Sequence, residues 1–268
     1  MNNPSPISRR AAFSLIEMLI TVALLAFIVV GLMAMFVQTQ KAFRGGIAQT
    51  DVLEAGRAVT DLLARELEQT SPSQLAGYTN FFAKPNKSTA QSLPGGSASR
   101  TNVLSYFFFL TRNNLDWSGI GYVVSPASEG VGTLYRYETN APSSRLPGVN
   151  SFLNANSSAL HRVADGIVHF QIEAYDRNGI RITSQNTNGI YAAPLLNSVE
   201  YSFTGNAVPA YLELELGVLE YQTLKKLQAL PAAGTVREVY LAREQTAGRV
   251  HIFRRHITIR NVDPEAYP

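Results

Sequence analysis

The 268-residue sequence contains no cysteine, which excludes disulfide bridges, thiolate metal ligands and cysteine nucleophiles together. It also lacks the P-loop, the dinucleotide-binding fingerprint and the Gly-x-Ser-x-Gly motif. Its four histidines show no His-x-x-x-His spacing, although zinc sites depend on such clusters. We therefore expect no enzymatic activity, no bound metal and no cofactor.

Net charge is also low. The formal charge is +3, and Arg9 and Arg10 supply two of these charges. This balance gives no argument for a nucleic-acid-binding protein. Hydrophobic residues make up 46% of the chain, enough for one sizeable core after the N-terminal stretch is set aside.

What the sequence does have is a long apolar run at residues 13–37, in which only Ser14, Glu17 and Thr21 are markedly polar. As a helix rising ~1.5 Å per residue, this run exceeds the ~30 Å hydrocarbon core of a bilayer. A secretory signal peptide has a shorter apolar region and a small-x-small cleavage site, which this run offers only poorly. The pattern predicts a retained membrane-spanning helix.

Glu17 lies near the start of the apolar run. A charge at the centre of such a helix costs roughly 2.5 kcal/mol or more, and less near the membrane interface. One interpretation is a carboxylate tolerated at the edge of the membrane. The other is that Glu17 has a partner: cleavage before Phe13 would create an α-ammonium group on the same helix or on a neighbouring subunit.

The stretch "RRAAFSLIEMLITVALLAFIVV" resembles the processing site and transmembrane helix of type IV pilins and type II secretion pseudopilins. The resemblance implies cleavage between Ala12 and Phe13 by a prepilin peptidase, N-methylation of Phe13 and an assembly role for Glu17. Arg9 and Arg10 would be the charges of a leader peptide, residues 1–12, that stays in the cytoplasm. Ala12 departs from the family, which usually has glycine there.

Beyond the glycine pair at 45–46, apolar and small residues recur in steps of three and four, at Ile47, Val52, Ala55, Val59, Leu62, Leu63 and Leu67. This spacing predicts an amphipathic helix. Ser71-Pro72 provides a stop, so residues 14–69 are expected to form one long helix. Its 13–37 part would face lipid and its 38–70 part would pack on a domain; a coiled coil is the alternative.

Residues 71–102 are rich in Ser, Thr, Asn, Pro and Gly, and are expected to be an irregular connection. From residue 103 the apolar period changes to two, as in β-strands. The expected strands are "VLSYFFFL", "IGYVV", "TLYRYE", "IVHFQIEAY", "VEYSF", "YLELEL" and "VHIFRRHITI", with a short helix within 217–234. Within the fourth strand, Val168, Phe170, Ile172 and Ala174 are expected to share one face.

The predicted fold is therefore α+β: a long N-terminal helix packed on a mainly antiparallel, pilin-like β-sheet domain at 71–268. The order of "GTLYRYE", "VADGIVHFQIEAYDRNG", "VPAYLELEL" and "VHIFRRHITI" after the helix also resembles minor pseudopilins of the GspJ/PulJ type. That resemblance implies a subunit near the tip of a periplasmic pseudopilus. Its expected partners are prepilin peptidase/methyltransferase, other minor pseudopilins, the major pseudopilin, an inner-membrane assembly platform and secreted cargo.

Two further patterns have simple structural explanations. Asp176, Asn178 and Gly179 resemble the start of a calcium loop, but the acid expected some eight positions later is missing, and a turn between strands explains them. Glu213 and Glu215 are two apart on a strand, so they share a face. Such a pair can serve glycoside hydrolysis, but a solvated sheet face accounts for it without a cleft motif.

Arg249, Arg254, Arg255 and Arg260 form a basic patch near the C-terminus. It could contact an acidic partner or DNA phosphate. With Phe253 as the only stacking aromatic in the run, a charged edge strand protected against aggregation is the simpler interpretation.

The sequence as a whole predicts a structural, non-enzymatic pseudopilin. It would be single-pass in the inner membrane, with a cytoplasmic N-terminus and a periplasmic C-terminal domain, before joining the pseudopilus. The alternatives are a minor type IV pilin for adhesion or DNA uptake, and an unprocessed single-span protein with an external binding domain.

Overall fold

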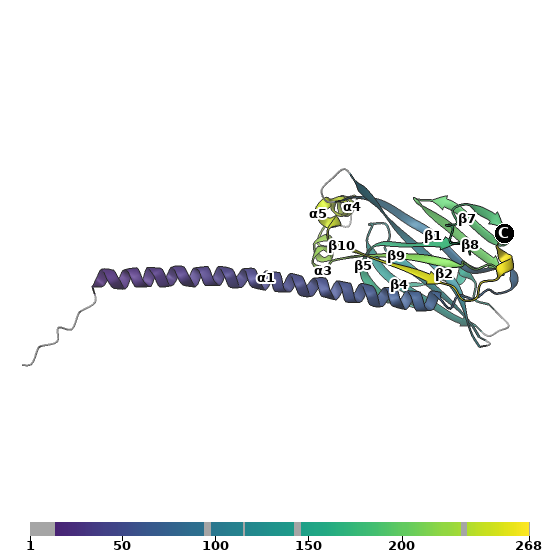
Figure 1. The fold of residues 1–268 in the computed structure, drawn as a ribbon, viewed down its shortest axis with the longest axis horizontal. Coiled ribbons are helices and arrows are strands. Elements are labelled where there is room, and N and C mark those ends of the chain that lie inside the picture. Colours follow the sequence, from purple (N-terminus) through teal and green to yellow (C-terminus); the bar gives the residue numbers. More distant parts are fainter. Residues whose placement is uncertain (1–13, 94–97, 115, 142–145, 232–234, 268) are drawn as a thin grey trace, which may run out of the picture. The chain divides into compact units, whose positions relative to one another are not determined.

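The structure is a computed structural model that describes residues 14–93, 98–114, 116–141, 146–231 and 235–267. The chain divides into two compact units, Met1–Ile47 and Ala48–Pro268. Helix α1, Leu15–Leu67, is continuous through the glycine pair at 45–46, which therefore does not break it. In the second unit, α1 packs on a large sheet (Figure 1).

The described residues of the second unit form a sheet of ten strands in the order β10-β9-β5-β4-β3-β2-β1-β8-β7-β6. All strand pairs are antiparallel except a single parallel bridge between β5 and β2, so the predicted α+β class is confirmed. The strands are β1 Leu75–Ser92, β2 Ser99–Asn113, β3 Asp116–Ser125, β4 Gly132–Ala141, β5 Leu160–Tyr175, β6 Gln185–Thr187, β7 Ile190–Leu195, β8 Ser198–Gly205, β9 Tyr211–Leu219 and β10 Val250–Thr258.

Short helices fill the connections. The expected helix within 217–234 is α3, and no other short helix was expected from the sequence. The helices are α2 Val149–Leu153, η1 Ser157–Ala159, α3 Tyr221–Gln228, α4 Val236–Ala242, α5 Glu244–Ala247 and η2 Pro264–Ala266. All seven predicted strands are present.

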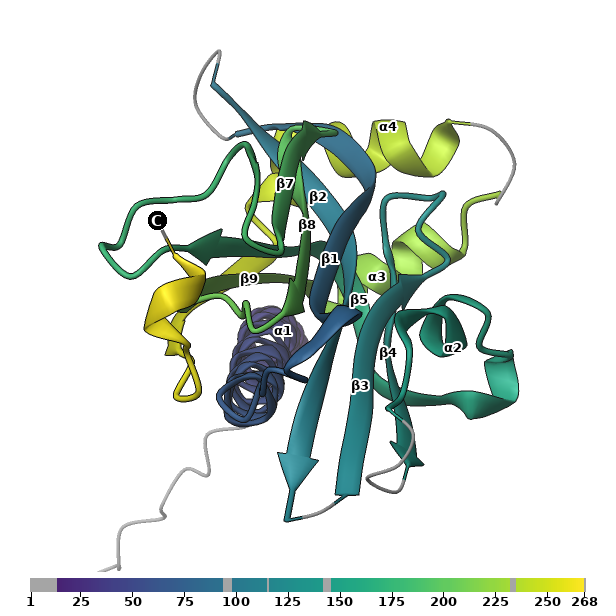
Figure 2. The same cartoon turned by 90° about the vertical axis from the view of Figure 1, so that its right-hand side faces the viewer.

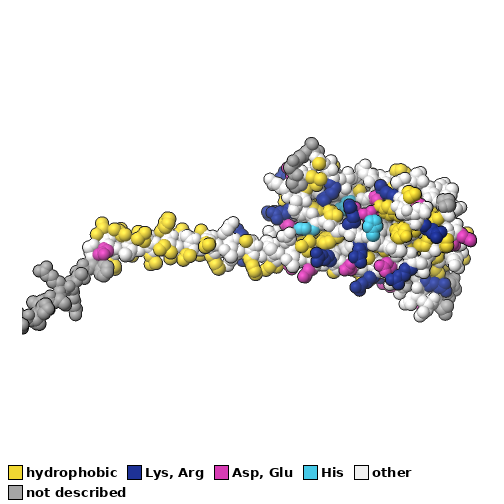
Figure 3. All heavy atoms as spheres, viewed as in Figure 1, with side chains coloured by type: hydrophobic (Ala, Val, Ile, Leu, Met, Phe, Trp, Pro, Cys, Tyr) yellow, Lys and Arg dark blue, Asp and Glu magenta, His cyan; other side chains and the backbone are white. Residues whose placement is uncertain are grey.

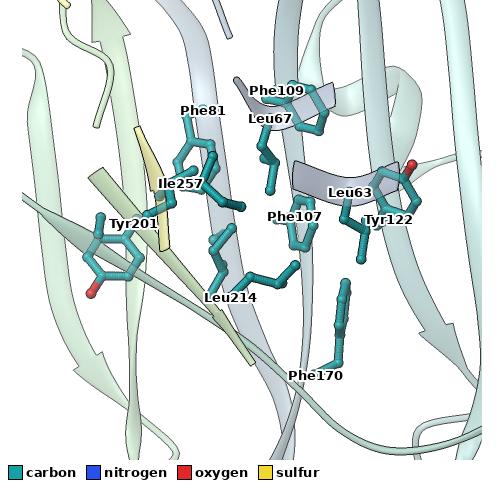
Figure 4. Close-up of a cluster of buried hydrophobic side chains, with 14 of the residues drawn as sticks. Leu63, Leu67, Phe81, Phe107, Phe109, Tyr122, Phe170, Tyr201, Leu214 and Ile257 are labelled. Carbon is teal, nitrogen blue, oxygen red and sulfur yellow. The ribbon is translucent and has the colours of Figure 1, made fainter. Parts of the chain in front are cut away.

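The buried stripe of α1 was predicted only in part. Val52, Val59, Leu63 and Leu67 are buried, as expected, and Figure 4 shows Leu63 and Leu67 pointing into the aromatic core. The other predicted positions do not lie on the stripe: Ile47, Ala55 and Leu62 are exposed. Small residues take their place, since the buried set also contains Gly56, Thr60 and Ala64. The buried face of α1 is therefore rotated relative to the predicted one, and its small residues allow the sheet to approach the helix closely.

The core between α1 and the sheet is aromatic. Phe107 of β2 lies at its centre, with its ring centroid 5.5 Å from that of Tyr122 and 5.2 Å from that of Phe170. All three side chains are fully buried (Figure 4). Burial of such large side chains is the main stabilising contribution to this layer.

The prediction of an irregular connection at 71–102 was wrong, because β1 occupies Leu75–Ser92. Phe81 and Ala83 are buried and pair with both β2 and β8, so tertiary packing overrides a polar composition. Pro85, which would interrupt a regular ladder, lies where the pairing with β2 shifts register and after the pairing with β8 has ended.

Val168 does not share a face with Phe170, Ile172 and Ala174, contrary to the alternation expected. The pairing of β5 with β9 shifts register between Ile167 and His169, which marks a β-bulge. The bulge places Ile167 in the main core with Phe170, and Val168 in a second cluster with α3.

Candidate functional site

The first unit offers a helix with an unburied apolar surface. Every large apolar side chain of α1 from Leu15 to Val37 is exposed, with the exposed fraction running from 42% to 84%, and Figure 3 shows hydrophobic side chains along this stretch. The helix is long and apolar enough to cross a membrane. Such a surface needs lipid or other helices to cover it, which suggests a membrane anchor.

Glu17 is exposed in the first turn of α1, and its backbone N–H donates to the Ser14 hydroxyl at 3.3 Å. Ser14 thus acts as the N-cap, and Glu17 occupies the third helical position, as in a capping box. A carboxylate there is also favoured by the helix dipole. The Ser-x-x-Glu spacing is itself a sequence signal for the start of a helix, and the prediction of the helix from its apolar run did not include it.

Within the described residues Glu17 forms no ion pair. The predicted processing residues Ala12 and Phe13 and the leader charges Arg9 and Arg10 lie outside the described residues. Cleavage between Ala12 and Phe13 and methylation of Phe13 thus remain predictions.

A mostly buried ion pair fastens the end of α1 to the sheet. Arg136 of β4 lies 3.0 Å from the Glu66 carboxylate through Nη2, and its Nε donates to the same carboxylate at 3.0 Å. Tyr122 of β3 donates to Glu66 at 2.5 Å. Burial raises the pKa of the Tyr122 hydroxyl, and the adjacent Glu66 carboxylate raises it further. The tyrosine therefore stays protonated and serves as a permanent donor.

Glu213 and Glu215 of β9 share a face, as predicted, but they are not simply solvated. Their side chains are 14% and 23% exposed. Arg254 of β10 reaches both, at 3.3 Å from Glu213 and 2.5 Å from Glu215. His169 of β5 lies 3.3 Å from Glu215 through Nε2 and accepts the backbone N–H of Val103 at Nδ1. The ring proton is thus on Nε2, pointing at Glu215.

The pKa values of the neighbouring carboxylates Glu215 and Glu173 are shifted in opposite directions. The His169 ring, 3.3 Å away, holds the pKa of Glu215 below its ordinary value, with help from Arg254. Burial raises the pKa of Glu173 on β5, against the attraction of Arg181. Figure 3 shows basic, acidic and histidine side chains gathered on this side of the head.

The predicted basic patch is largely neutralised. Arg249 pairs with Glu220 at 3.2 Å, Arg260 pairs with Glu68 at 3.2 Å, and Arg254 pairs with Glu213 and Glu215. Arg255 is exposed and has no ion-pair partner within the part of the chain that the structure describes. The four arginines therefore do not form a continuous cationic surface.

Asp176 closes a turn after β5, as expected, but the segment that follows forms only an isolated bridge, Arg181 with Tyr175, and no strand before β6. The Asp176 Oδ1 accepts the backbone N–H groups of Asn178 at 2.9 Å and Ile180 at 2.7 Å, and Gly179 has a φ of +75°. This oxygen is already used, and no cluster of three or more metal-ligating side chains occurs among the described residues. The turn is therefore explained without a calcium ion.

A cavity of about 660 Å³ lies beside the second half of α1, against β5, β9 and α3. Its walls are mostly small or apolar side chains, including Val52, Val59 and Leu224. Two of its charged residues are already satisfied, because Arg162 Nε donates to Asp165 at 2.9 Å, and Thr133 donates to the same carboxylate at 2.8 Å. The cavity offers packing surface rather than reactive groups.

Comparison with known families adds one finding. Residues 7–33 match the prokaryotic N-terminal methylation motif, the signal of type IV pilins and pseudopilins. The matched segment contains Arg9, Arg10, Ala12, Phe13 and Glu17. No curated protein and no solved structure matches the chain. The motif indicates a pilin-like protein that is processed by prepilin peptidase and assembles into a pilus-type structure, and it says nothing of the head.

Proposed function

We propose that the chain is a structural minor pseudopilin of a type II secretion-like system. It is cut between Ala12 and Phe13, methylated at Phe13 and assembled near the tip of a periplasmic pseudopilus. Before assembly it spans the inner membrane once, with its N-terminus in the cytoplasm and its head in the periplasm. The observation that carries the proposal is Glu17, exposed at the start of an unburied apolar helix within a methylation motif.

The assembly step is electrostatic. When the apolar part of α1 moves from lipid into a bundle of like helices, an isolated carboxylate becomes costly to keep. The new α-ammonium group of a Phe13 terminus would neutralise Glu17 only when the neighbouring helix is in the correct register. A wrong register leaves the charge unpaired, at a cost of several kcal/mol. Glu17 thus selects the register of the filament.

The head supports a packing role over a catalytic or DNA-binding one. Three of the four arginines in the basic patch already face glutamates, so few cations are left to release counterions from DNA. The finer assignment is supported by the resemblance of the order of sequence stretches, from "GTLYRYE" to "VHIFRRHITI", to that in the J-type pseudopilins. The partners would be the processing peptidase, sibling pseudopilins, the assembly platform and secreted cargo.

The test begins with mass spectrometry of the protein isolated from its native envelope. We expect a chain that starts at methyl-Phe13; a chain that retains residues 1–12 would refute the proposal in favour of an unprocessed single-span protein. A minor pilin of an adhesion or DNA-uptake machine would be processed in the same way. It would be recognised by loss of adhesion or transformation, rather than of secretion, when the gene is deleted.

Variants at Glu17 then separate its charge from its place in the helix cap. Glutamine also fits the third position of a capping box, so Glu17→Gln keeps the local geometry and removes the charge. We expect Glu17→Gln and Glu17→Ala to insert in the membrane but to fail to enter filaments. Ser14→Ala is the matched control, because it weakens the cap and keeps the charge. Normal incorporation of Glu17→Gln would contradict the pairing mechanism.

A further inference from the structure

A polar cleft lies at the end of the head where α1 terminates. Two adjoining cavities, of about 580 Å³ and about 350 Å³, share Ser71, Arg112 and Asn261 as lining residues. Asn261 donates to the Ser71 hydroxyl at 3.0 Å and so ties the C-terminal chain to the segment after α1. Figure 2 shows the last turn of α1 and the C-terminal chain near each other. We refer to this pair of cavities as the distal cleft.

The distal cleft carries more positive than negative charge. Its cations are Arg65, Arg112 and Arg260, and its acids are Glu68 and Asp263. Arg260 is paired with Glu68 at 3.2 Å, yet its side chain is 78% exposed. Arg65 is exposed and has no ion-pair partner within the described ranges of the chain. The lining residues carry a net charge of +1, and neither Arg65 nor Arg112 has an ion-pair partner among the described residues.

Arg112 is held in position by groups other than carboxylates in the part of the chain that the structure describes. Its Nε donates to the Asn114 carbonyl at 3.1 Å, and its guanidinium carbon lies 5.5 Å from the centroid of the Trp117 ring. Neither contact neutralises its charge. The guanidinium is therefore oriented in advance and remains available to an anionic ligand, which lowers the entropy lost on binding.

The backbone around the cleft is fixed in an unusual conformation. Gln74 and Asn114 both line the larger cavity and both have positive φ, +60° and +55°. Such residues persist only where the surroundings determine them, and they gather at binding sites. Asn80, fully buried, supports the segment before Gln74: it accepts the Ser73 N–H at 2.8 Å and donates to the carbonyls of Gly205 and Ala207, both at 2.8 Å.

We propose that the distal cleft binds an acidic peptide segment of a protein that the machine handles. This inference rests on the proposed function. Guanidinium groups recognise carboxylates through charge-assisted, often bidentate hydrogen bonds. The amide of Asn114 and the amide oxygens of Asn206 and Asn261, whose nitrogens already donate within the protein, offer donors and acceptors that match a peptide backbone. Trp117 is only 7% exposed, so it presents no open face on which a sugar ring could stack, and this favours a peptide over a polysaccharide.

The test uses the full chain in detergent micelles and two fluorescently labelled probes. One probe is the peptide Gly-Glu-Ser-Glu-Gly-Glu-Ser-Glu, and the other replaces every glutamate with glutamine. We expect saturable binding of the glutamate peptide alone, with a change in the emission of Trp117, the only tryptophan in the chain. Because Arg112 covers that ring, ligand binding at Arg112 reports directly on the tryptophan.

Single arginine variants locate the site. We expect Arg112→Gln and Arg65→Gln each to weaken the glutamate peptide about tenfold, the size of one charge-assisted hydrogen bond. Arg57→Gln is the matched control, because Arg57 is an exposed arginine on the same helix that does not line the cleft. Circular dichroism confirms that each variant is folded, and Arg65, an exposed helix residue, gives a second variant if Arg112→Gln is unstable.

Several results would overturn the inference. These are equal binding of the glutamine peptide, no saturable binding of the glutamate peptide, or an equal loss in Arg57→Gln, which would indicate non-specific attraction. If oligogalacturonate binds and the peptide does not, with the same dependence on Arg112, the ligand is an acidic polysaccharide and the proposal of an acidic peptide is wrong. A processed chain that binds no peptide refutes this inference alone, whereas an unprocessed chain that binds it refutes the proposed function alone.

Discussion

The ion pair between Glu66 and Arg136 is expected to hold the end of α1 on the sheet, and Arg136→Ala tests this directly. The substitution leaves Glu66 with Tyr122 as its remaining partner, in a site where the carboxylate side chain is 16% exposed. Removing one member of a buried pair costs ~3–5 kcal/mol because the other charge stays buried without compensation. Since both side chains keep some solvent contact, we expect about 3 kcal/mol, the lower end of that range.

A double variant separates the cost of leaving Glu66 without its ion-pair partner from the cost of losing the packing of the Arg136 side chain. In the double variant Glu66→Leu with Arg136→Met, neither charge remains and both stems are replaced by apolar groups. We expect this variant to recover most of the stability lost in Arg136→Ala, because desolvation of the pair offsets much of its attraction. Arg162→Ala is the control: Arg162 is 66% exposed and pairs with Asp165 on the surface, so its loss should cost no more than ~1 kcal/mol.

The assay is urea unfolding of the full chain in detergent micelles, followed by the fluorescence of Trp117 in β3, which neighbours β4 in the sheet. The midpoint and the slope give the free energy of unfolding for each variant. The reasoning fails if Arg136→Ala costs no more than Arg162→Ala. It also fails if the double variant is as unstable as Arg136→Ala, since packing rather than an uncompensated charge would then explain the loss.

Two other predictions concern packing and pH. Gly56→Ala should destabilise the head by ~1–3 kcal/mol in the same assay, because an added Cβ would overlap the ring of Phe253. Gly45→Ala is the control and should not destabilise the chain, because the space around Gly45 is open. Equal effects of the two substitutions would refute the close contact between Gly56 and Phe253. Glu215 has a lowered pKa in the fold, so the unfolded chain takes up its proton first as pH falls below the ordinary value of 4.5, and this contribution to stability is lost progressively in that range. Glu215→Gln should therefore make the free energy of unfolding fall less steeply as the pH is lowered. Glu173 has a raised pKa in the fold, so its contribution to stability is lost as the pH rises through that pKa, and Glu173→Gln should change the curve in the opposite sense. Identical pH profiles for the two variants would contradict this assignment.

The elements that could be predicted are those whose periodicity depends on one buried face. The apolar run and the three-and-four spacing predicted α1, and alternation predicted strands such as β9, where Leu212, Leu214 and Leu216 are fully buried. β1 could not be predicted in the same way. Only a few of its residues face the core, and its polar side chains are tolerated because neighbouring strands satisfy the backbone on both sides over Phe81–Ala83.

The bulge in β5 shows a second limit. Alternation in the sequence places Val168 with Phe170, but one extra residue opposite β9 puts Ile167, rather than Val168, in the cluster of Phe170. The reversal gives α3 its own apolar contact, Val168 beside Leu224 and Leu227 in one cluster. The alternation of apolar residues within one strand does not show where its pairing with a neighbouring strand contains a β-bulge. The second cluster therefore could not be predicted from the sequence.

The basic patch illustrates the same limit for function. In the sequence, Arg254 belongs to a run of cations, and nothing local indicates an acid nearby. In the sheet, the antiparallel register of β10 on β9 sets Arg254 opposite Glu215, and Glu213 lies on the same face. Glu215 is then shared with His169 from the next strand. A run of positively charged residues in the sequence therefore forms a cationic surface only if the neighbouring strand presents no acidic side chains opposite it. This depends on the pairing register of the strands, which cannot be read from a single sequence.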